Sequence, residues 1–98
     1  MKRINKNKKF WVIAYDITDD LRRSRLVKVI EKFGVRVNYS VFECMLTDVQ
    51  LCKLQEKVDK LILPSEDNVI YYPLCLECYS KIIYSPARYV KPRVVTVV

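Results

Sequence analysis

Residues 12–26 read VIAYDITDDLRRSRL, and they join an apolar run to a charged segment through a single aspartate. Val12 to Tyr15, together with Ile17, are typical of a buried strand. Asp16 interrupts that pattern, and burying an unpaired carboxylate costs several kcal/mol. Three roles for Asp16 are open at this point: it caps a turn, it pairs with an arginine, or it holds a metal ion.

The residues on either side predict a strand followed by a helix. We expect the strand over residues 10–17, and a helix that begins at a cap on Thr18 or Asp19 and ends near Phe33. Gly34 is expected at the C′ position, where helices often end in a left-handed residue. A buried stripe recurs at helical spacing, formed by Leu26, Val29, Ile30 and Phe33.

The chain after Gly34 predicts further strands and a second helix. Residues 35–46 alternate between apolar and polar and predict either one long strand or a hairpin that turns near residues 38–40. Thr47 and Gln50 form a capping-box signature for a second amphipathic helix, which Pro64 ends. We expect further strands over residues 68–74 and 81–84.

If the middle segment is a hairpin, the order is β-α-β-β-α-β, which is the ferredoxin-like arrangement. The prediction is an α+β sandwich, with two helices on one face of an antiparallel sheet and an extra C-terminal strand. Because the strand over residues 10–17 is apolar on both sides, the opposite face also needs a cover. A second copy of the chain is the simplest cover, so we expect a sheet-to-sheet homodimer.

The charge of the chain is uneven. Its 98 residues carry a net charge of +7, and the first 36 hold eleven of the eighteen Lys and Arg but four of the eleven acids. This favours a polyanionic partner, RNA or duplex DNA before a membrane surface, although a generally basic solvated face is the alternative. No apolar run has the length of a membrane span, and the N-terminal residues lack a signal-like apolar stretch. We therefore expect a cytoplasmic protein with no membrane partner.

The four cysteines give a weak signal for a metal. Cys75 and Cys78 form a CxxC pair, but Cys44 and Cys52 have the wrong spacing for a second pair, and the chain has no histidine. Reduced thiols packed in the core are the stronger expectation.

The favoured role for Asp16 is that of a metal ligand and catalytic residue. Mg²⁺, or alternatively Mn²⁺, prefers carboxylate oxygens, and two copies of Asp16 could share one ion across the two-fold axis of a dimer. Arg23, Arg25 and Arg36 could then hold a phosphate backbone beside the metal. The alternative for these arginines is solvation and local pairing with Asp19, Asp20 or Glu31.

Residues 15–44, YDITDDLRRSRLVKVIEKFGVRVNYSVFEC, resemble the signature region of the Cas2 family of CRISPR-associated adaptation proteins. The matching pieces are YDI around Asp16, the basic helix with Arg23 and Arg25, the FGVRV turn, and SVFE at residues 40–43. VIYYPLCLEC further along is similar to the family's fourth strand and the turn after it. The departures are Asn38, where the family often has glutamine, and an N-terminal basic arm over residues 1–9 that we expect to be flexible.

This resemblance implies a ferredoxin-like domain over residues 10–85 and a strand over residues 86–98 that pairs across a homodimer. It also implies Mg²⁺ held by Asp16 near the two-fold axis. The activity it implies is endonuclease cleavage of single-stranded RNA or duplex DNA, in a protein that bridges two dimers of the integrase subunit Cas1 during spacer acquisition. The positions that match residues of the nuclease site are Arg23, Arg25, Arg36, Ser40 and Phe42. For Phe42, stacking on a base and packing in the core are both open.

Two alternatives keep the fold but change the function. The first is a DNA-binding adaptor without catalysis, in which phosphate contacts come from Arg22, Arg23, Arg25, Lys28 and Lys32. The second is a toxin-type ribonuclease.

Overall fold

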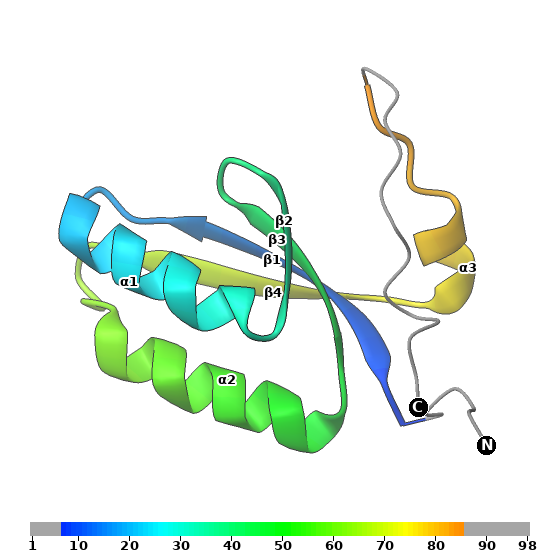
Figure 1. Ribbon diagram of the computed structural model, residues 1–98, viewed down its shortest axis with the longest axis horizontal. Helices are drawn as coiled ribbons and strands as arrows, with labels where there is room; N and C mark the ends of the chain where they lie inside the picture. Colours follow the sequence, from blue (N-terminus) through cyan, green and yellow to red (C-terminus); the bar gives the residue numbers. More distant parts are fainter. Residues whose placement is uncertain (1–6, 86–98) are drawn as a thin grey trace.

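The computed structural model describes residues 7–85 as one sheet with two long helices and one short helix (Figure 1). The elements follow the order β1 (Lys9–Asp16), α1 (Asp20–Glu31), β2 (Gly34–Asn38), β3 (Val41–Leu46), α2 (Asp48–Leu61), β4 (Asn68–Leu74) and α3 (Leu76–Ser80). The middle segment is therefore a hairpin, β2–β3, and not one long strand.

The sheet has the strand order β2-β3-β1-β4, and each neighbouring pair is antiparallel. Helices α1 and α2 lie side by side on one face of this sheet (Figure 1). The predicted α+β class and its ferredoxin-like order are confirmed.

The core lies between the sheet and these two helices. Its fully buried side chains come from β1, α1, β3 and α2: Ile13, Leu26, Ile30, Phe42, Cys44, Leu54 and Val58, each 0% exposed. Phe42 contacts Tyr15 with a distance of 6.2 Å between ring centroids. Of the two roles left open for Phe42, the structure supports the core residue, because a fully buried ring offers no face to a base.

The helix starts follow the predicted capping chemistry. The side chain of Asp19 accepts the N–H of Arg22 at 2.9 Å, so Asp19 and not Asp16 is the cap of α1. Thr47 and Gln50 form the predicted capping box at the start of α2, with reciprocal hydrogen bonds of 3.1 and 2.9 Å.

Gly34 was expected as a left-handed C′ residue, and this is wrong. It begins β2 without a left-handed backbone, directly opposite Cys44. A Cβ at Gly34 would lie 2.5 Å from the carbonyl oxygen of Glu43 and closer still to the sulfur of Cys44. Glycine is needed here for close packing of two strands.

The strand predicted over residues 81–84 is not formed. Cys75 instead caps the short helix α3, and irregular chain follows it. The ring of Tyr79 in α3 packs against that of Phe10, with centroids 4.0 Å apart and the ring planes tilted by 44°. The hydroxyl of Tyr84 donates to the buried carboxylate of Glu43 at 2.7 Å. These contacts cover part of the sheet face that lies opposite α1 and α2.

The rest of that face stays apolar and exposed. Val35, Ile70 and Tyr72 are 40%, 47% and 49% exposed. The homodimer predicted to cover this face is not tested by a single chain, and it stays a prediction.

The expectation that the thiols pack in the core holds for Cys44 alone. Cys52, Cys75 and Cys78 are exposed. The N–H of Cys78 donates to the sulfur of Cys75 at 3.4 Å, and this hydrogen bond lowers the pKa of the Cys75 thiol. Within residues 7–85, no group of three or more His, Cys, Asp or Glu side chains is placed to hold a metal.

Both chain ends lie outside the described residues. The strand expected over residues 86–98 cannot be compared, and neither can most of the arm expected over residues 1–9, although Lys9 already belongs to β1. In the described part, every helix is too short or too polar to cross a bilayer.

One ion pair fixes the loop between α2 and β4 against α1. Arg22 donates from Nε to Asp67 at 2.8 Å and from Nη2 to Asp67 and Glu66 at 3.2 and 3.1 Å. The Asp67 side chain is 0% exposed and also accepts the N–H of Leu63 at 2.7 Å. The bonds from Arg22 and then from Leu63 lower the pKa of Asp67 below its ordinary 3.8.

We predict that Asp67→Asn lowers the urea midpoint at pH 7, because it leaves Arg22 facing an uncharged group. The pKa of Asp67 is lowered by folding, so its charge stabilises the fold above pH 3.8. That contribution is lost as the pH falls through the lowered value, and the gap between the two proteins should narrow in acid. Urea unfolding of both proteins from pH 7 to pH 2.5 measures this. Glu66→Gln, which removes a more exposed partner, is the control, and an equal effect from it would contradict the assignment.

We also predict that Phe42→Ala lowers the free energy of unfolding by about 3–5 kcal/mol, because it empties a fully buried site. Urea unfolding measures the loss. If the variant were as stable as the parent chain while its affinity for nucleic acid fell, the core assignment would be wrong.

Candidate functional site

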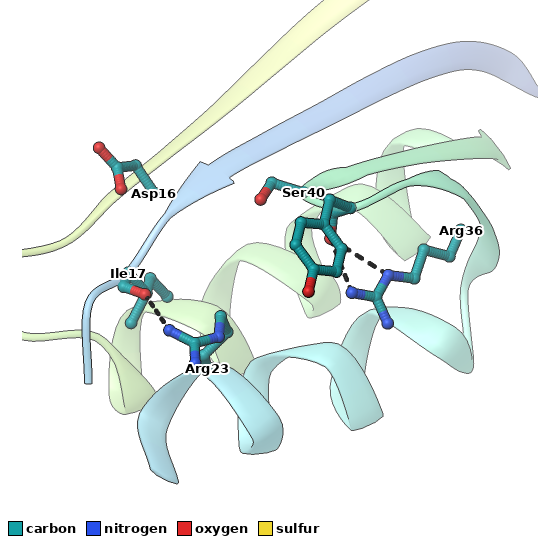
Figure 2. Close-up of a pocket in the computed structure, with 6 residues that line it drawn as sticks. Asp16, Ile17, Arg23, Arg36 and Ser40 are labelled. Atoms are coloured by element: carbon teal, nitrogen blue, oxygen red, sulfur yellow. Dashed lines mark hydrogen bonds between the residues drawn. The ribbon is translucent and has the colours of Figure 1, made fainter. Parts of the chain in front are cut away.

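Asp16 lies at the end of β1 with its carboxylate exposed to solvent. It pairs in register with Asn68, and its neighbours Tyr15 and Ile17 are buried on the helix side. Alternation along the strand therefore turns Asp16 to the opposite side, and Figure 2 shows it pointing away from α1 and Arg23. Among residues 7–85 its carboxylate has no hydrogen bond and no ion pair. The turn-capping and arginine-pairing roles are not observed, so the metal-ligand role is the one left as a prediction.

Arg23 holds the loop that follows Asp16. Its Nη1 donates to the carbonyl oxygen of Ile17 at 2.8 Å (Figure 2) and to that of Thr18 at 3.3 Å. Its Nη2 pairs with Asp20. The local pairing considered as an alternative for the arginines is thus present for Arg23. This guanidinium fixes the backbone directly after Asp16.

Arg36 holds the turn between β2 and β3. Its Nε and Nη2 donate to the carbonyl oxygen of Tyr39 at 3.2 and 2.8 Å (Figure 2). The same oxygen accepts the hydroxyl of Tyr15 at 3.0 Å, and the N–H of Tyr15 donates to the carbonyl of Ser40 at 3.1 Å. The turn is therefore fastened to the end of β1, beside Asp16.

These side chains line one pocket of about 350 Å³, formed by Asp16, Ile17, Arg23, Arg36, Tyr39 and Ser40. A second hollow of about 280 Å³ lies between α1 and β2 and shares Arg23 and Arg36 with the first. Lys28 lines this second hollow together with Ser24, Val27 and Glu31. The two neighbouring hollows are lined by three basic residues, Arg23, Lys28 and Arg36, which we call the basic path.

The other predicted contacts divide into two groups. Arg25, Lys28 and Lys32 are exposed on α1, at a helical spacing of three and four residues. Arg22 is turned toward Asp67, and the hydrogen bond with Asp67 raises the pKa of its guanidinium. Phe42 is in the core. We therefore leave Arg22 and Phe42 out of the candidate nucleic-acid contacts.

The fit of the pocket to a divalent metal depends on a second copy of the chain. Asp16 is the acidic residue of the pocket, and Ser40 adds a hydroxyl group. Mg²⁺ and Mn²⁺ prefer oxygen ligands and keep several waters, so one carboxylate per chain fits an ion shared by two chains. One chain alone provides too few protein ligands.

Sequence reasoning missed Tyr39 and Asp67. Tyr39 falls within the alternating segment over residues 35–46, but it lies in the turn, next to a shift in the register of β2 against β3 between Arg36 and Asn38. The turn signal at residues 38–40 was the available sign that Tyr39 leaves the strand. Nothing in the local pattern near Asp67 indicated a partner 45 residues away.

Comparison with known proteins agrees with this geometry. The family model for "CRISPR associated protein Cas2" matches residues 9–82. A Synechocystis protein named "CRISPR-associated endoribonuclease Cas2 3" is 45% identical over 64 residues, which are 65% of this chain and 70% of that protein. A second Synechocystis protein, "CRISPR-associated endoribonuclease Cas2 2", is 41% identical over 87 residues, 85% of this chain and 92% of that one.

A solved structure described as a "Partial Cas6-RT-Cas1--Cas2 complex" contains a chain that superposes with a TM-score of 0.71. Its sequence is 29% identical, and the match covers 81% of this chain and 92% of that chain. The family match spans β1 to β4, α1 and α2, including the pocket around Asp16. The chain therefore belongs to the Cas2 family of CRISPR-associated proteins.

Proposed function

We propose that this chain is a metal-dependent endonuclease that acts as a homodimer in CRISPR spacer acquisition. The observation that carries the proposal is the exposed carboxylate of Asp16, which has no partner within residues 7–85 and belongs to a residue that lines one pocket with Arg23 and Arg36. The names of its relatives support the activity, since they are called CRISPR-associated endoribonucleases. They support RNA as a substrate, and the basic path beside the pocket also fits duplex DNA.

The two arginines of the pocket keep donors for a phosphate. A guanidinium has five N–H donors. Arg36 donates from Nε and Nη2 to the carbonyl oxygen of Tyr39, and its Nη1 group donates to no residue in the described part of the chain. Arg23 likewise donates from Nη1 to the loop after β1 and from Nη2 to Asp20, and its Nε donates to no residue within residues 7–85. The protein contacts orient each fork, so a phosphate meets donors that are already in place.

The metal in this proposal is Mg²⁺, or alternatively Mn²⁺, held by Asp16 of both subunits. When bound, the ion supplies an acidified water and polarises a phosphate oxygen. Asp16 would orient it, and Arg23 and Arg36 would offset the negative charge that develops on the phosphate. The chain has no histidine to act as a general base, which favours a metal for this step.

The homodimer in this proposal covers the open face of the sheet. The exposed side chains of Val35, Ile70 and Tyr72 on that face favour burial against another apolar surface. Asp16 projects to the same side of the sheet, so a partner on that face brings two copies of Asp16 toward each other.

We predict that Asp16→Asn lowers the rate of cleavage about a hundredfold or more. Loss of a residue that only hydrogen-bonds to a metal ligand typically lowers activity by about 10- to 100-fold, and loss of the ligand itself should lower it at least as much. The substrates are labelled single-stranded RNA and duplex DNA, each assayed with Mg²⁺ and with EDTA. EDTA should abolish cleavage by the parent chain. Asp59→Asn, which removes a carboxylate from the exposed side of α2, is the control and should cleave normally.

Equal cleavage by the Asp16→Asn variant and the parent chain would overturn the catalytic role. Cleavage that persists in EDTA would overturn the metal.

A second candidate function is the adaptor that binds duplex DNA and joins integrase dimers without cutting. The exposed basic stripe of Arg25, Lys28 and Lys32 on α1 favours it, since none of these three residues lines the Asp16 pocket. The similar solved chain comes from a complex that contains Cas1, which supports a Cas1 partner for this protein. The toxin-type ribonuclease has no such support, and we set it aside.

We predict that replacing Arg25, Lys28 and Lys32 together by Gln weakens binding to duplex DNA and reduces its salt dependence. Each lost phosphate contact makes the negative slope of log K against log salt shallower by about 0.9. Fluorescence anisotropy between 50 and 300 mM salt measures the slope. The control replaces Lys53, Lys57 and Lys60 of α2, which removes the same charge from another exposed face. Equal changes in both variants would indicate a general charge effect and contradict the stripe.

A further inference from the structure

Tyr39 is the most exposed aromatic residue of the described chain for its size, with 84% of its surface open to solvent. It lies in the turn between β2 and β3 and lines the pocket that contains Asp16. A single exposed aromatic side chain is ordinary on a protein surface. The environment of Tyr39 is what distinguishes it.

The backbone of Tyr39 is held from three directions. Its carbonyl oxygen accepts the Tyr15 hydroxyl at 3.0 Å and the Arg36 guanidinium at 3.2 and 2.8 Å. Its N–H donates to the side chain of Asn38 at 2.7 Å. A turn that only reverses the chain needs none of these side-chain contacts. They fix the position of the Tyr39 backbone, while the ring itself stays exposed to solvent.

The ring also has a charged neighbour with a role in the pocket. The guanidinium carbon of Arg36 lies 5.7 Å from the centroid of the Tyr39 ring, within the range of a cation–π contact. Arg36 keeps N–H donors for a phosphate, as described above. One nucleotide could therefore place its phosphate at Arg36 and its base at Tyr39.

We propose that Tyr39 is a stacking platform for one unpaired nucleobase of a single strand whose phosphate lies in the Asp16 pocket. This inference rests on the proposed function and adds a preference for single-stranded substrate. A base inside a duplex already has a stacked neighbour on each face, whereas a splayed base has a face free for an aromatic ring. Tyr39 is then a specificity residue and takes no part in the chemistry.

The side chain of Tyr39 can be changed without touching the contacts that hold the turn, because those contacts use its backbone. Tyr39→Ala and Tyr39→Leu remove the ring, and Leu keeps apolar bulk. Tyr39→Phe keeps the ring and removes the hydroxyl. Affinity is measured by fluorescence anisotropy in EDTA, with a fluorescein-labelled 12-nucleotide oligouridine and a 20-base-pair DNA duplex.

We expect Ala and Leu at position 39 to weaken binding of the oligouridine about 5- to 100-fold, the range typical of one base stacked on an aromatic ring. Phe should bind within about twofold of the parent chain, and the duplex should bind all four proteins equally. A second measurement replaces one uridine at a time by an abasic residue. One position should lower the affinity of the parent chain and leave that of the Tyr39→Ala variant unchanged.

Several results would overturn the role of Tyr39 as a stacking platform. One is that the Ala variant binds oligouridine within twofold of the parent chain, and another is that the Leu variant binds it as tightly as the parent chain. A further one is that the Ala and Leu variants lose as much affinity for the duplex as for oligouridine. A parent chain that does not bind oligouridine at all would overturn it too. Failure of the nuclease is a separate result, because it is read from cleavage with Mg²⁺ and the Asp16→Asn variant, and the binding assay contains no metal.

Discussion

The hydrogen bonds of Tyr15 with the β2–β3 turn are the contacts on which the site depends. The N–H of Tyr15 reaches Ser40, and its hydroxyl reaches the carbonyl of Tyr39. Tyr15 directly precedes Asp16, so the strand that carries the carboxylate and the turn that carries Arg36 are fastened at one point. Because Tyr15 is itself buried in the core, packing of the sheet against the helices fixes the geometry of the pocket.

Two aromatic residues of the NYSVFE segment have opposite roles because one lies in a strand and the other in the turn before it. Phe42 follows the alternation of β3 and points into the core. Tyr39 lies in the turn between β2 and β3, next to the register shift between Arg36 and Asn38, and its ring is exposed. The segment can therefore combine a buried ring and an exposed ring three residues apart.

Much of the fold could be predicted from the sequence because its signals are local. The capping box at Thr47 and Gln50 and the apolar spacing of α1 depend on residues within one or two turns, and both are confirmed. Gly34 failed because its reason is a contact with Cys44 on the neighbouring strand, which no local pattern contains. The role of Arg22 was misjudged for the same reason, since its partner Asp67 comes from a distant loop.

The arginines of α1 show why charge alone did not assign the site. Arg22, Arg23 and Arg25 are close in sequence, but successive residues of a helix point about 100° apart. Arg22 forms an ion pair with the buried Asp67, Arg23 donates to the loop after Asp16, and Arg25 is exposed to solvent. One basic segment thus supports the fold, shapes the pocket and offers charge to a polyanion. The same net charge on a helix of different phase would give none of this division.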